Sequence, residues 1–236
     1  MLSSGYKSIR EGNTIKKALA ELVFILDRSG SMSGLESDTI GGYNSLLDKQ
    51  KKEDGECFVT TVLFDDKYEL LHDRVNLESI RPISEREYFV RGCTALLDAV
   101  GRTIDKISNE QKHTAEDERA EKVMFVIITD GMENASCEYG YDKVRQMIER
   151  QKEKYGWEFI FLGANIDAVE TAARFGISAD RAANYHADPE GTQLNYEVVS
   201  EVASCFRANA APISADWKKR IDEDYKKRGG RKKGTV

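Results

Sequence analysis

Asp27, Ser29 and Ser31 occupy alternate positions directly after the apolar run at residues 22–26. One carboxylate and two hydroxyls on a short loop form a compact set of hard oxygen donors, which suit Mg²⁺, Mn²⁺ or Ca²⁺ better than zinc. The apolar run predicts a buried strand. In an open α/β sheet, the loop after such a strand lies at the edge where these folds bind ligands. The sequence therefore predicts a divalent-cation site at this loop.

Two further segments bring oxygen donors toward the same predicted edge. Thr94 stands at the start of a predicted helix, and Asp130 follows residues 123–128, the most apolar run in the chain. If the strands at 22–26 and 123–128 are neighbours, Asp27 and Asp130 face each other. Two carboxylates at such close range repel, and a divalent cation between them removes that cost.

Strands alternate with helices along the chain, and this order predicts an α/β fold. The expected architecture is a doubly wound, mostly parallel sheet with helices on both faces and one antiparallel edge strand at 68–75. The other strands are predicted at 22–26, 58–64, 123–128 and 157–162, with a weak candidate at 183–186. Helices are predicted around 37–47, from Thr94 to Ile107, and at 141–155 and 166–175, with a charged surface connection at 108–122.

The chain divides by composition into four predicted segments. A polar N-terminal segment covers residues 1–20, and the α/β domain covers 21–186. A helical C-terminal extension with two helices broken at Pro212 covers 187–225, and these helices either form an additional contact surface or complete the domain's own packing. Residues 226–236 form a basic tail that we expect to be disordered.

The charge balance argues against several classes of partner. The net charge of −6 includes six basic residues among the last eleven, so the remaining residues carry −12. A body this acidic is not expected to bind nucleic acid, except weakly through the tail. No run approaches the ~18 apolar residues of a membrane-spanning helix. The four cysteines form no C-x-x-C pair, so we expect free thiols and a cytoplasmic protein.

The pattern Asp27-x-Ser29-x-Ser31, followed by Thr94 and then Asp130, resembles the metal-ion-dependent adhesion site (MIDAS) of von Willebrand factor A (vWA) domains. The resemblance spans residues 20–186 and implies a Rossmann-like vWA fold. It also implies that the three hydroxyls bind Mg²⁺, with Mn²⁺ or Ca²⁺ as alternatives, and that the two carboxylates bind it directly or through water.

The same resemblance implies a function without catalysis. In the family, one coordination position stays open and accepts an acidic side chain of a partner. The implied activity is therefore metal-dependent binding of a protein that offers an Asp or Glu carboxylate. Intracellular members often act as adaptors, including beside ring-forming ATPases, so an ATPase complex is one candidate partner.

Other readings of these residues stay open at this stage. Ser29 would serve equally as a turn residue, Thr94 as a helix N-cap, and Asp130 as part of a turn. The first loop is also similar to the opening motif of haloacid-dehalogenase-type phosphatases, with Asp27 as nucleophile. However, Ser29 stands where that chemistry needs a second carboxylate. A third alternative is a metal that only stabilises the fold.

Neighbouring polar residues also have two readings each. Arg28, between two of the predicted ligands, would either steer a partner's carboxylate or lie in solvent on the loop. Glu133 and Asn134 fall on a loop at the same predicted edge. They would either support the ligands or be exposed to solvent.

Overall fold

A single twisted sheet organises the computed structural model, which describes residues 19–208 and 212–230. Within these residues the sheet has six strands in the order β3-β2-β1-β4-β5-β6, and all neighbouring pairs are parallel except β2 with β3. The strands are β1 (Ala20–Asp27), β2 (Cys57–Phe64), β3 (Tyr68–Asn76), β4 (Lys122–Thr129), β5 (Glu158–Gly163) and β6 (Ala182–Asn184). This arrangement confirms the predicted fold class, including the antiparallel edge strand.

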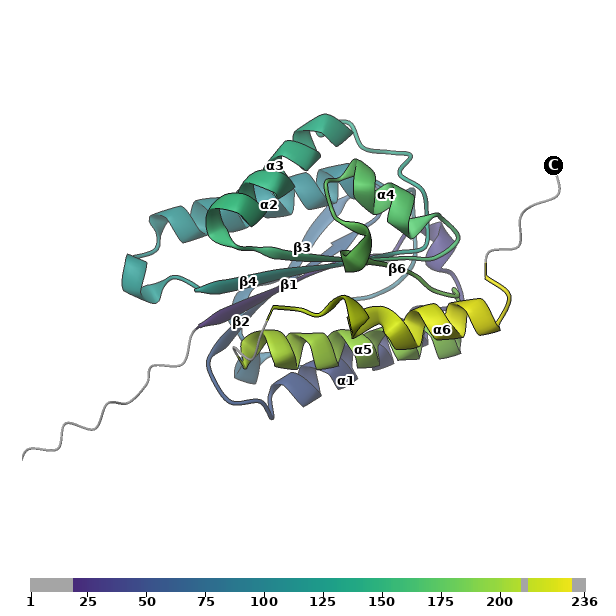
Figure 1. The fold of residues 1–236 in the computed structure, drawn as a ribbon, viewed down its shortest axis with the longest axis horizontal. Coiled ribbons are helices and arrows are strands. Elements are labelled where there is room, and N and C mark those ends of the chain that lie inside the picture. Colours follow the sequence, from purple (N-terminus) through teal and green to yellow (C-terminus); the bar gives the residue numbers. More distant parts are fainter. Residues whose placement is uncertain (1–18, 209–211, 231–236) are drawn as a thin grey trace, which may run out of the picture.

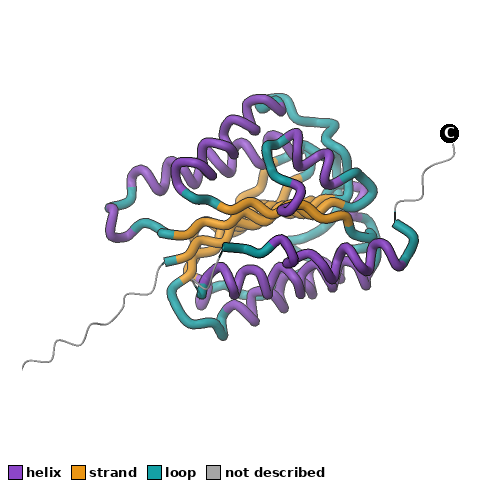
Figure 2. The backbone as a smooth tube through the Cα atoms, viewed as in Figure 1, coloured by secondary structure: helices purple, strands orange, loops and turns teal. Residues whose placement is uncertain are grey.

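Helices cover both faces of the sheet, as Figures 1 and 2 show. One layer contains α1 (Glu36–Gln50), α5 (Pro189–Arg207) and α6 (Lys219–Lys227). The other layer contains α2 (Leu96–His113), α3 (Tyr141–Tyr155) and α4 (Ala168–Arg174). The sheet therefore has a hydrophobic core on each side.

The position of β1 in the middle of the sheet explains why its sequence is apolar at nearly every residue. Phe24 contributes to the core beneath α1 and α5, whereas Val23 and Ile25 contribute to the core beneath α2 and α3. A strand buried on both faces has no solvent-facing side, so its sequence is continuously apolar rather than alternating. β4, which pairs with β1, has the same character.

Several element boundaries differ from the sequence-based expectation. α2 continues to His113, so the predicted surface connection at 108–122 begins with helix. Apolar residues are sparse there because the last turns face solvent, and Lys112 and His113 suit a helix C-terminus. α5 begins at Pro189, earlier than expected, and the Asp188 side chain accepts a hydrogen bond from the Gly191 amide as its N-cap.

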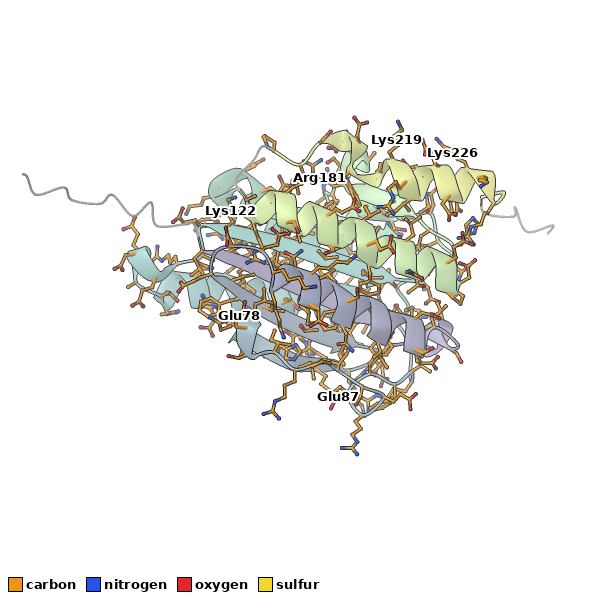
Figure 3. All side chains as sticks on the ribbon, turned by 90° about the horizontal axis from the view of Figure 1, so that it is seen from below. Glu78, Glu87, Lys122, Arg181, Lys219 and Lys226 are labelled. Carbon is orange, nitrogen blue, oxygen red and sulfur yellow. The ribbon has the colours of Figure 1, made fainter. Side chains whose placement is uncertain are left out.

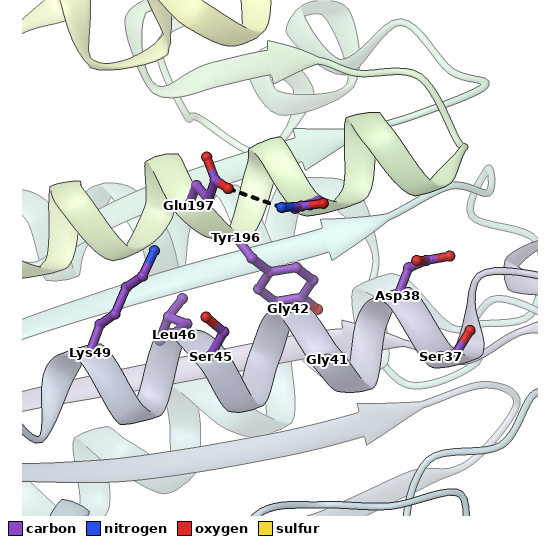
Figure 4. A pocket seen from close by; sticks show the side chains of 10 residues that line it. Ser37, Asp38, Gly41, Gly42, Ser45, Leu46, Lys49, Tyr196 and Glu197 are labelled. Atoms are coloured by element: carbon purple, nitrogen blue, oxygen red, sulfur yellow. Dashed lines mark hydrogen bonds between the residues drawn. The ribbon is translucent and has the colours of Figure 1, made fainter.

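The segment predicted as a helical extension packs as part of the α1 layer. The Tyr196 side chain extends from α5 toward Gly42 of α1 (Figure 4). A Cβ atom at Gly42 would lie only 2.3 Å from Cδ2 of that ring, so glycine is what allows this close approach. Val199 and Ala203 of α5 join the same core as Phe24.

The termini are described only in part. Residues 1–18 and 231–236, which hold most of the predicted N-terminal segment and the end of the basic tail, lie outside the described residues. Lys226 ends up on the exposed side of α6 (Figure 3). Arg228, predicted to be disordered, instead pairs with Asp188 at 2.6 Å and with Asp224 at 2.7 Å, because two carboxylates lie close to its guanidinium. No helix in the described parts of the chain is long and apolar enough to cross a bilayer.

Candidate metal centre

The loop that follows β1, the first loop of the site, lies at the middle of the sheet. Strand order reverses direction at the β1–β4 pair, and β1 ends at Asp27. The Asp27 carboxylate is 1% exposed. Its Oδ1 accepts a hydrogen bond from the Ser29 amide at 2.7 Å, and its Oδ2 accepts one from the Thr129 hydroxyl at 2.6 Å. These bonds fix the carboxylate between β1 and the end of β4.

The three predicted hydroxyl ligands meet beside this carboxylate. Ser29 Oγ and Ser31 Oγ share a hydrogen bond of 3.0 Å, and Thr94 Oγ1 donates to Ser29 Oγ at 3.0 Å. A Cβ atom at Gly131 would lie 2.9 Å from Thr94 Oγ1 and 3.0 Å from Ser31 Oγ. The backbone that follows Asp130 therefore lies directly against the hydroxyl cluster, and glycine leaves room for it.

Asp130 is the most unusual group at this edge. Its side chain is 2% exposed, and neither carboxylate oxygen has a hydrogen-bond partner among the described residues. Burial raises the pKa of Asp130 to about 6, with the nearby Ser31 hydroxyl opposing and the Asp27 charge reinforcing the rise. Burial also raises the pKa of Asp27 above its ordinary value. A buried carboxylate without partners carries a large cost that a bound cation would remove.

The donor set fits a hard divalent cation. It combines two carboxylates with three hydroxyls, and such oxygen ligands suit Mg²⁺, Mn²⁺ or Ca²⁺. No group of three or more His, Cys, Asp or Glu side chains that could hold a metal occurs among residues 19–208 and 212–230. The described chain thus offers no conventional zinc site.

Arg28 holds the loop that follows β1 in place through contacts with the β2–β3 hairpin. Contrary to both sequence-based readings, its side chain is fully buried. Its guanidinium donates to Asp65 Oδ2 at 2.9 Å and to Glu69 Oε2 at 2.7 Å, and Arg91 also donates to Asp65 Oδ2, at 2.6 Å. Although burial favours the neutral acid, Arg91 and Arg28 hold the pKa of Asp65 below its ordinary value. Arg28 therefore anchors the loop to the β2–β3 hairpin and is not available to a partner.

Thr94 does not serve as the N-cap of α2. The helix begins at Leu96, and the Leu97 amide donates to Glu133 Oε2 at 2.8 Å. The Thr94 amide donates to Asn134 Oδ1 at 2.9 Å, and the Asn134 amide donates back to the Thr94 carbonyl at 3.0 Å. The loop that follows β4 thus caps the helix, and the Thr94 hydroxyl points at Ser29 instead. Glu133 and Asn134 both hold this segment by hydrogen bonds, and Asn134 is exposed to solvent as well, so both of its sequence-based readings apply.

Asp98 is a supporting residue that sequence reasoning missed. It accepts hydrogen bonds from the amides of Cys137, Glu138 and Tyr139, each at 2.9 Å. These bonds hold the far end of the loop between β4 and α3 against α2. In the sequence, an aspartate in the first turn of a helix is already explained by the helix dipole, so nothing local reveals this second role.

Comparison with known proteins places the fold. No protein-family model matches the chain, and no curated protein matches it either. Solved structures do match. The von Willebrand factor type A protein from Catenulispora acidiphila superimposes with a TM-score of 0.54 at 11% identity, over 80% of this chain and 43% of that one. Manganese-loaded TRAP protein from Plasmodium vivax gives 0.52 at 17% identity, over 76% and 72%.

The chain has the von Willebrand factor A fold. Proximal thread matrix protein 1 from the mussel byssus, in a structure whose MIDAS motif is occupied by zinc, matches with a TM-score of 0.51 at 14% identity, over 80% of this chain and 46% of that one. This chain spans less than half the length of the mussel and Catenulispora proteins.

The vWA fold brings the five predicted site residues to one place. Asp27 ends β1, Ser29 and Ser31 lie in the turn that follows it, Asp130 follows β4, and Thr94 lies just before α2. Asp27 and the three hydroxyls are connected by hydrogen bonds through Ser29, and Asp130 lies beside Ser31. Metal binding by this set stays a prediction.

Proposed function

We propose that the chain is a divalent-metal-dependent protein-binding module. In this proposal Asp27, Ser29, Ser31, Thr94 and Asp130 hold Mg²⁺, with Mn²⁺ or Ca²⁺ as alternatives, and the bound ion accepts an Asp or Glu carboxylate of a partner protein. The observation that carries the proposal is the buried Asp130 carboxylate, whose two oxygens lack hydrogen-bond partners among the described residues. It lies beside the Ser31 hydroxyl, which belongs to the hydrogen-bonded cluster with Ser29 and Thr94.

The charges of the site suit an external carboxylate. Two carboxylates approximately neutralise a divalent ion, and hydroxyl ligands add no charge. Magnesium prefers near-octahedral coordination by oxygen and usually keeps some of its waters, so protein ligands need not complete the shell. A partner's carboxylate would then replace water in a charge-assisted contact. Two of the similar structures are manganese-loaded TRAP protein and proximal thread matrix protein 1 with a zinc-occupied MIDAS motif, which supports a divalent ion.

A phosphatase with Asp27 as nucleophile is the second candidate, and the local contacts disfavour it. Both oxygens of Asp27 accept hydrogen bonds, from the Ser29 amide and the Thr129 hydroxyl. The side chain that would act as acid and base in such an enzyme is replaced by Ser29. If this candidate were correct, the Mg²⁺-loaded protein would hydrolyse p-nitrophenyl phosphate, and Asp27→Asn would abolish that activity.

We also infer a reducing, cytoplasmic setting, in which an ATPase complex remains a candidate partner. All four cysteines are free, three of them exposed. Free exposed thiols persist where glutathione and thioredoxin keep them reduced.

Water-proton relaxation of the Mn²⁺-loaded protein tests whether the metal has an open position. We expect bound Mn²⁺ to enhance relaxation through exchangeable water, and the enhancement to fall when acetyl-Gly-Asp-Gly-amide is added. The Asn version of the peptide is the control and should change nothing. Equal responses to the two peptides, or none to either, would contradict carboxylate binding and favour a metal that only stabilises the fold.

A further inference from the structure

Large apolar side chains are rarely exposed on this protein, and those that are exposed are unevenly placed. In residues 19–208 and 212–230 there are three, namely Phe89 (41% exposed), Met132 (70%) and Tyr155 (50%). Phe89 and Met132 lie on the two loops that carry Thr94 and Asp130. Tyr155 lies at the end of α3, where the chain enters β5. Single exposed apolar residues are ordinary on a protein surface, so the informative observation is that two of these three lie on loops of the same candidate site.

Met132 lies next to the hydroxyl cluster, on the β4 side of the site. Its Cα is one peptide unit, about 3.8 Å, from that of Gly131. The Gly131 backbone itself lies so close that a Cβ there would be 2.9 Å from Thr94 Oγ1. Because Met132 is 70% exposed, the fold gains little from its side chain. Flexible methionines of this kind adapt to the shape of a partner's apolar group.

Phe89 lies on the opposite side of the site, toward the β2–β3 hairpin. Its ring centroid is 5.3 Å from Cζ of Arg28 and 5.2 Å from Cζ of Arg91. Both arginines pair with Asp65 at the end of β2, which fixes the direction in which the ring lies. The Arg91 amide donates to the Arg28 carbonyl at 2.9 Å, so Phe89 is tied to the loop that carries Ser29.

The charges around the site argue against a strongly acidic partner. Glu36 and Asp38 at the start of α1 and Asp66 after β2 are acidic residues near this edge, of which Asp66 is exposed and the other two are half-buried. The sequence outside the basic tail is acidic overall. A partner with many carboxylates would be repelled, whereas a partner with a single carboxylate would lose little binding free energy to repulsion.

We propose that the partner segment presents one Asp or Glu whose neighbours are apolar side chains, and that these cover Met132 and Phe89. This inference rests on the proposed function, because it names the chemistry of the partner at the same site. The carboxylate supplies the metal-dependent part of recognition. The flanking apolar contacts, which are dehydrated on binding, supply affinity and distinguish this partner from other acidic proteins.

Selection from a random dodecapeptide phage library tests the inference. The protein is immobilised in MgCl₂, bound phage are eluted with EDTA, and an enriched peptide is synthesised for titration. We expect one acidic residue with Leu, Ile, Met, Phe or Trp within two positions of it. Met132→Ser and Phe89→Ser should each weaken binding of the synthetic peptide about tenfold, while the affinity for Mg²⁺ is unchanged. Tyr155→Ser is the matched control and should have no effect.

The outcomes separate the inference from the function on which it rests. EDTA-eluted peptides that are acidic but lack apolar neighbours would overturn the inference and leave the metal-dependent function standing. The same holds if Met132→Ser and Phe89→Ser bind the peptide as tightly as Tyr155→Ser does. If no phage elute with EDTA, although calorimetry shows Mg²⁺ bound, the proposed function itself fails.

Discussion

Replacement of Asp130 by Asn is predicted to stabilise the metal-free protein and to remove its stabilisation by metal. The Asp130 carboxylate is buried and its oxygens have no partner within hydrogen-bond geometry in the described residues, so its charge is offset only in part, by the nearby Ser31 hydroxyl, when no cation is bound. An amide of nearly the same shape carries no charge. The variant therefore loses the cost of the buried charge together with the ability to hold the metal.

The magnitude follows from the pKa of this group. Burial raises the pKa of Asp130 from 3.8 to about 6. A rise of this size corresponds to about 3 kcal/mol at neutral pH, which screening by nearby solvent reduces to about 2 kcal/mol. The folded-state pKa lies above the unfolded one, so the folded protein binds the proton more tightly. The cost is consequently absent below pH ~4, develops as pH rises, and is complete above pH ~7.

Urea unfolding of both proteins in EDTA checks this prediction. At pH 7.5 we expect Asp130→Asn to be about 2 kcal/mol more stable than the wild type, and the difference to shrink toward pH 4 as Asp130 protonates. With Mg²⁺ at about 100 times its dissociation constant, the wild type should gain about 2.7 kcal/mol and the variant nothing. Apparent Mg²⁺ affinity should fall below pH ~6, where protons compete for the carboxylate.

The opposite result would refute the reasoning. If Asp130→Asn were less stable than the wild type in EDTA at pH 7.5, the carboxylate would be stabilising the metal-free fold. Asp130 would then have partners that the hydrogen-bond geometry does not reveal. A difference that stayed constant between pH 7.5 and pH 4 would equally contradict the assigned cause.

Four further substitutions test the packing around the site and in the adjoining helix layer. Arg28→Met removes one of the two arginines that pair with the buried Asp65 carboxylate, and because Arg91 keeps its contact we expect a cost of about 1–3 kcal/mol in urea unfolding, whereas no measurable loss would mean that the Arg28 pair is dispensable. Gly131→Ala places a Cβ 2.9 Å from the Thr94 hydroxyl, so calorimetry should find Mg²⁺ affinity at least about tenfold weaker, and unchanged affinity would refute the close packing. Gly42→Ala, whose Cβ would lie 2.3 Å from a ring of α5, should destabilise the fold by about 1–3 kcal/mol without affecting Mg²⁺. Its neighbour Gly41 has nothing within 4 Å of the corresponding position, so Gly41→Ala should stabilise by about 0.5–1 kcal/mol, and equal effects at the two glycines would contradict the packing of α1 on α5.

The sequence predicted those features that depend on local pattern. The run at residues 22–26 is apolar on both faces, so it indicates a central strand, and the alternating oxygen donors after it mark the sheet edge. The same reasoning applies to Asp130 after β4. The mostly parallel sheet with helices on both faces followed from the alternation of strands and helices, with a turn at residues 65–67 indicating the antiparallel edge, whereas the pairing of β1 with β4 entered only as a condition.

The features that escaped prediction depend on contacts between distant residues. Arg28 is buried because its partners Asp65 and Glu69, 37 and 41 positions away, meet it in the folded chain. The helix cap of α2 comes from Glu133, which accepts a hydrogen bond from the Leu97 amide 36 positions earlier. Likewise, the packing of Tyr196 on Gly42 joins helices separated by most of the chain. No local spacing encodes such pairs.

Calorimetric titration of chelator-stripped protein with MgCl₂ tests the central claim most directly, when wild type, Thr94→Ser and Thr94→Ala are compared. The Ser variant keeps the hydroxyl that lies 3.0 Å from Ser29 Oγ, and the Ala variant removes it. We predict saturable binding at one site for the wild type and for Thr94→Ser, and none for Thr94→Ala. Equal Mg²⁺ binding by Thr94→Ala, or no binding of Mg²⁺, Mn²⁺ or Ca²⁺ by the wild type, would contradict the account.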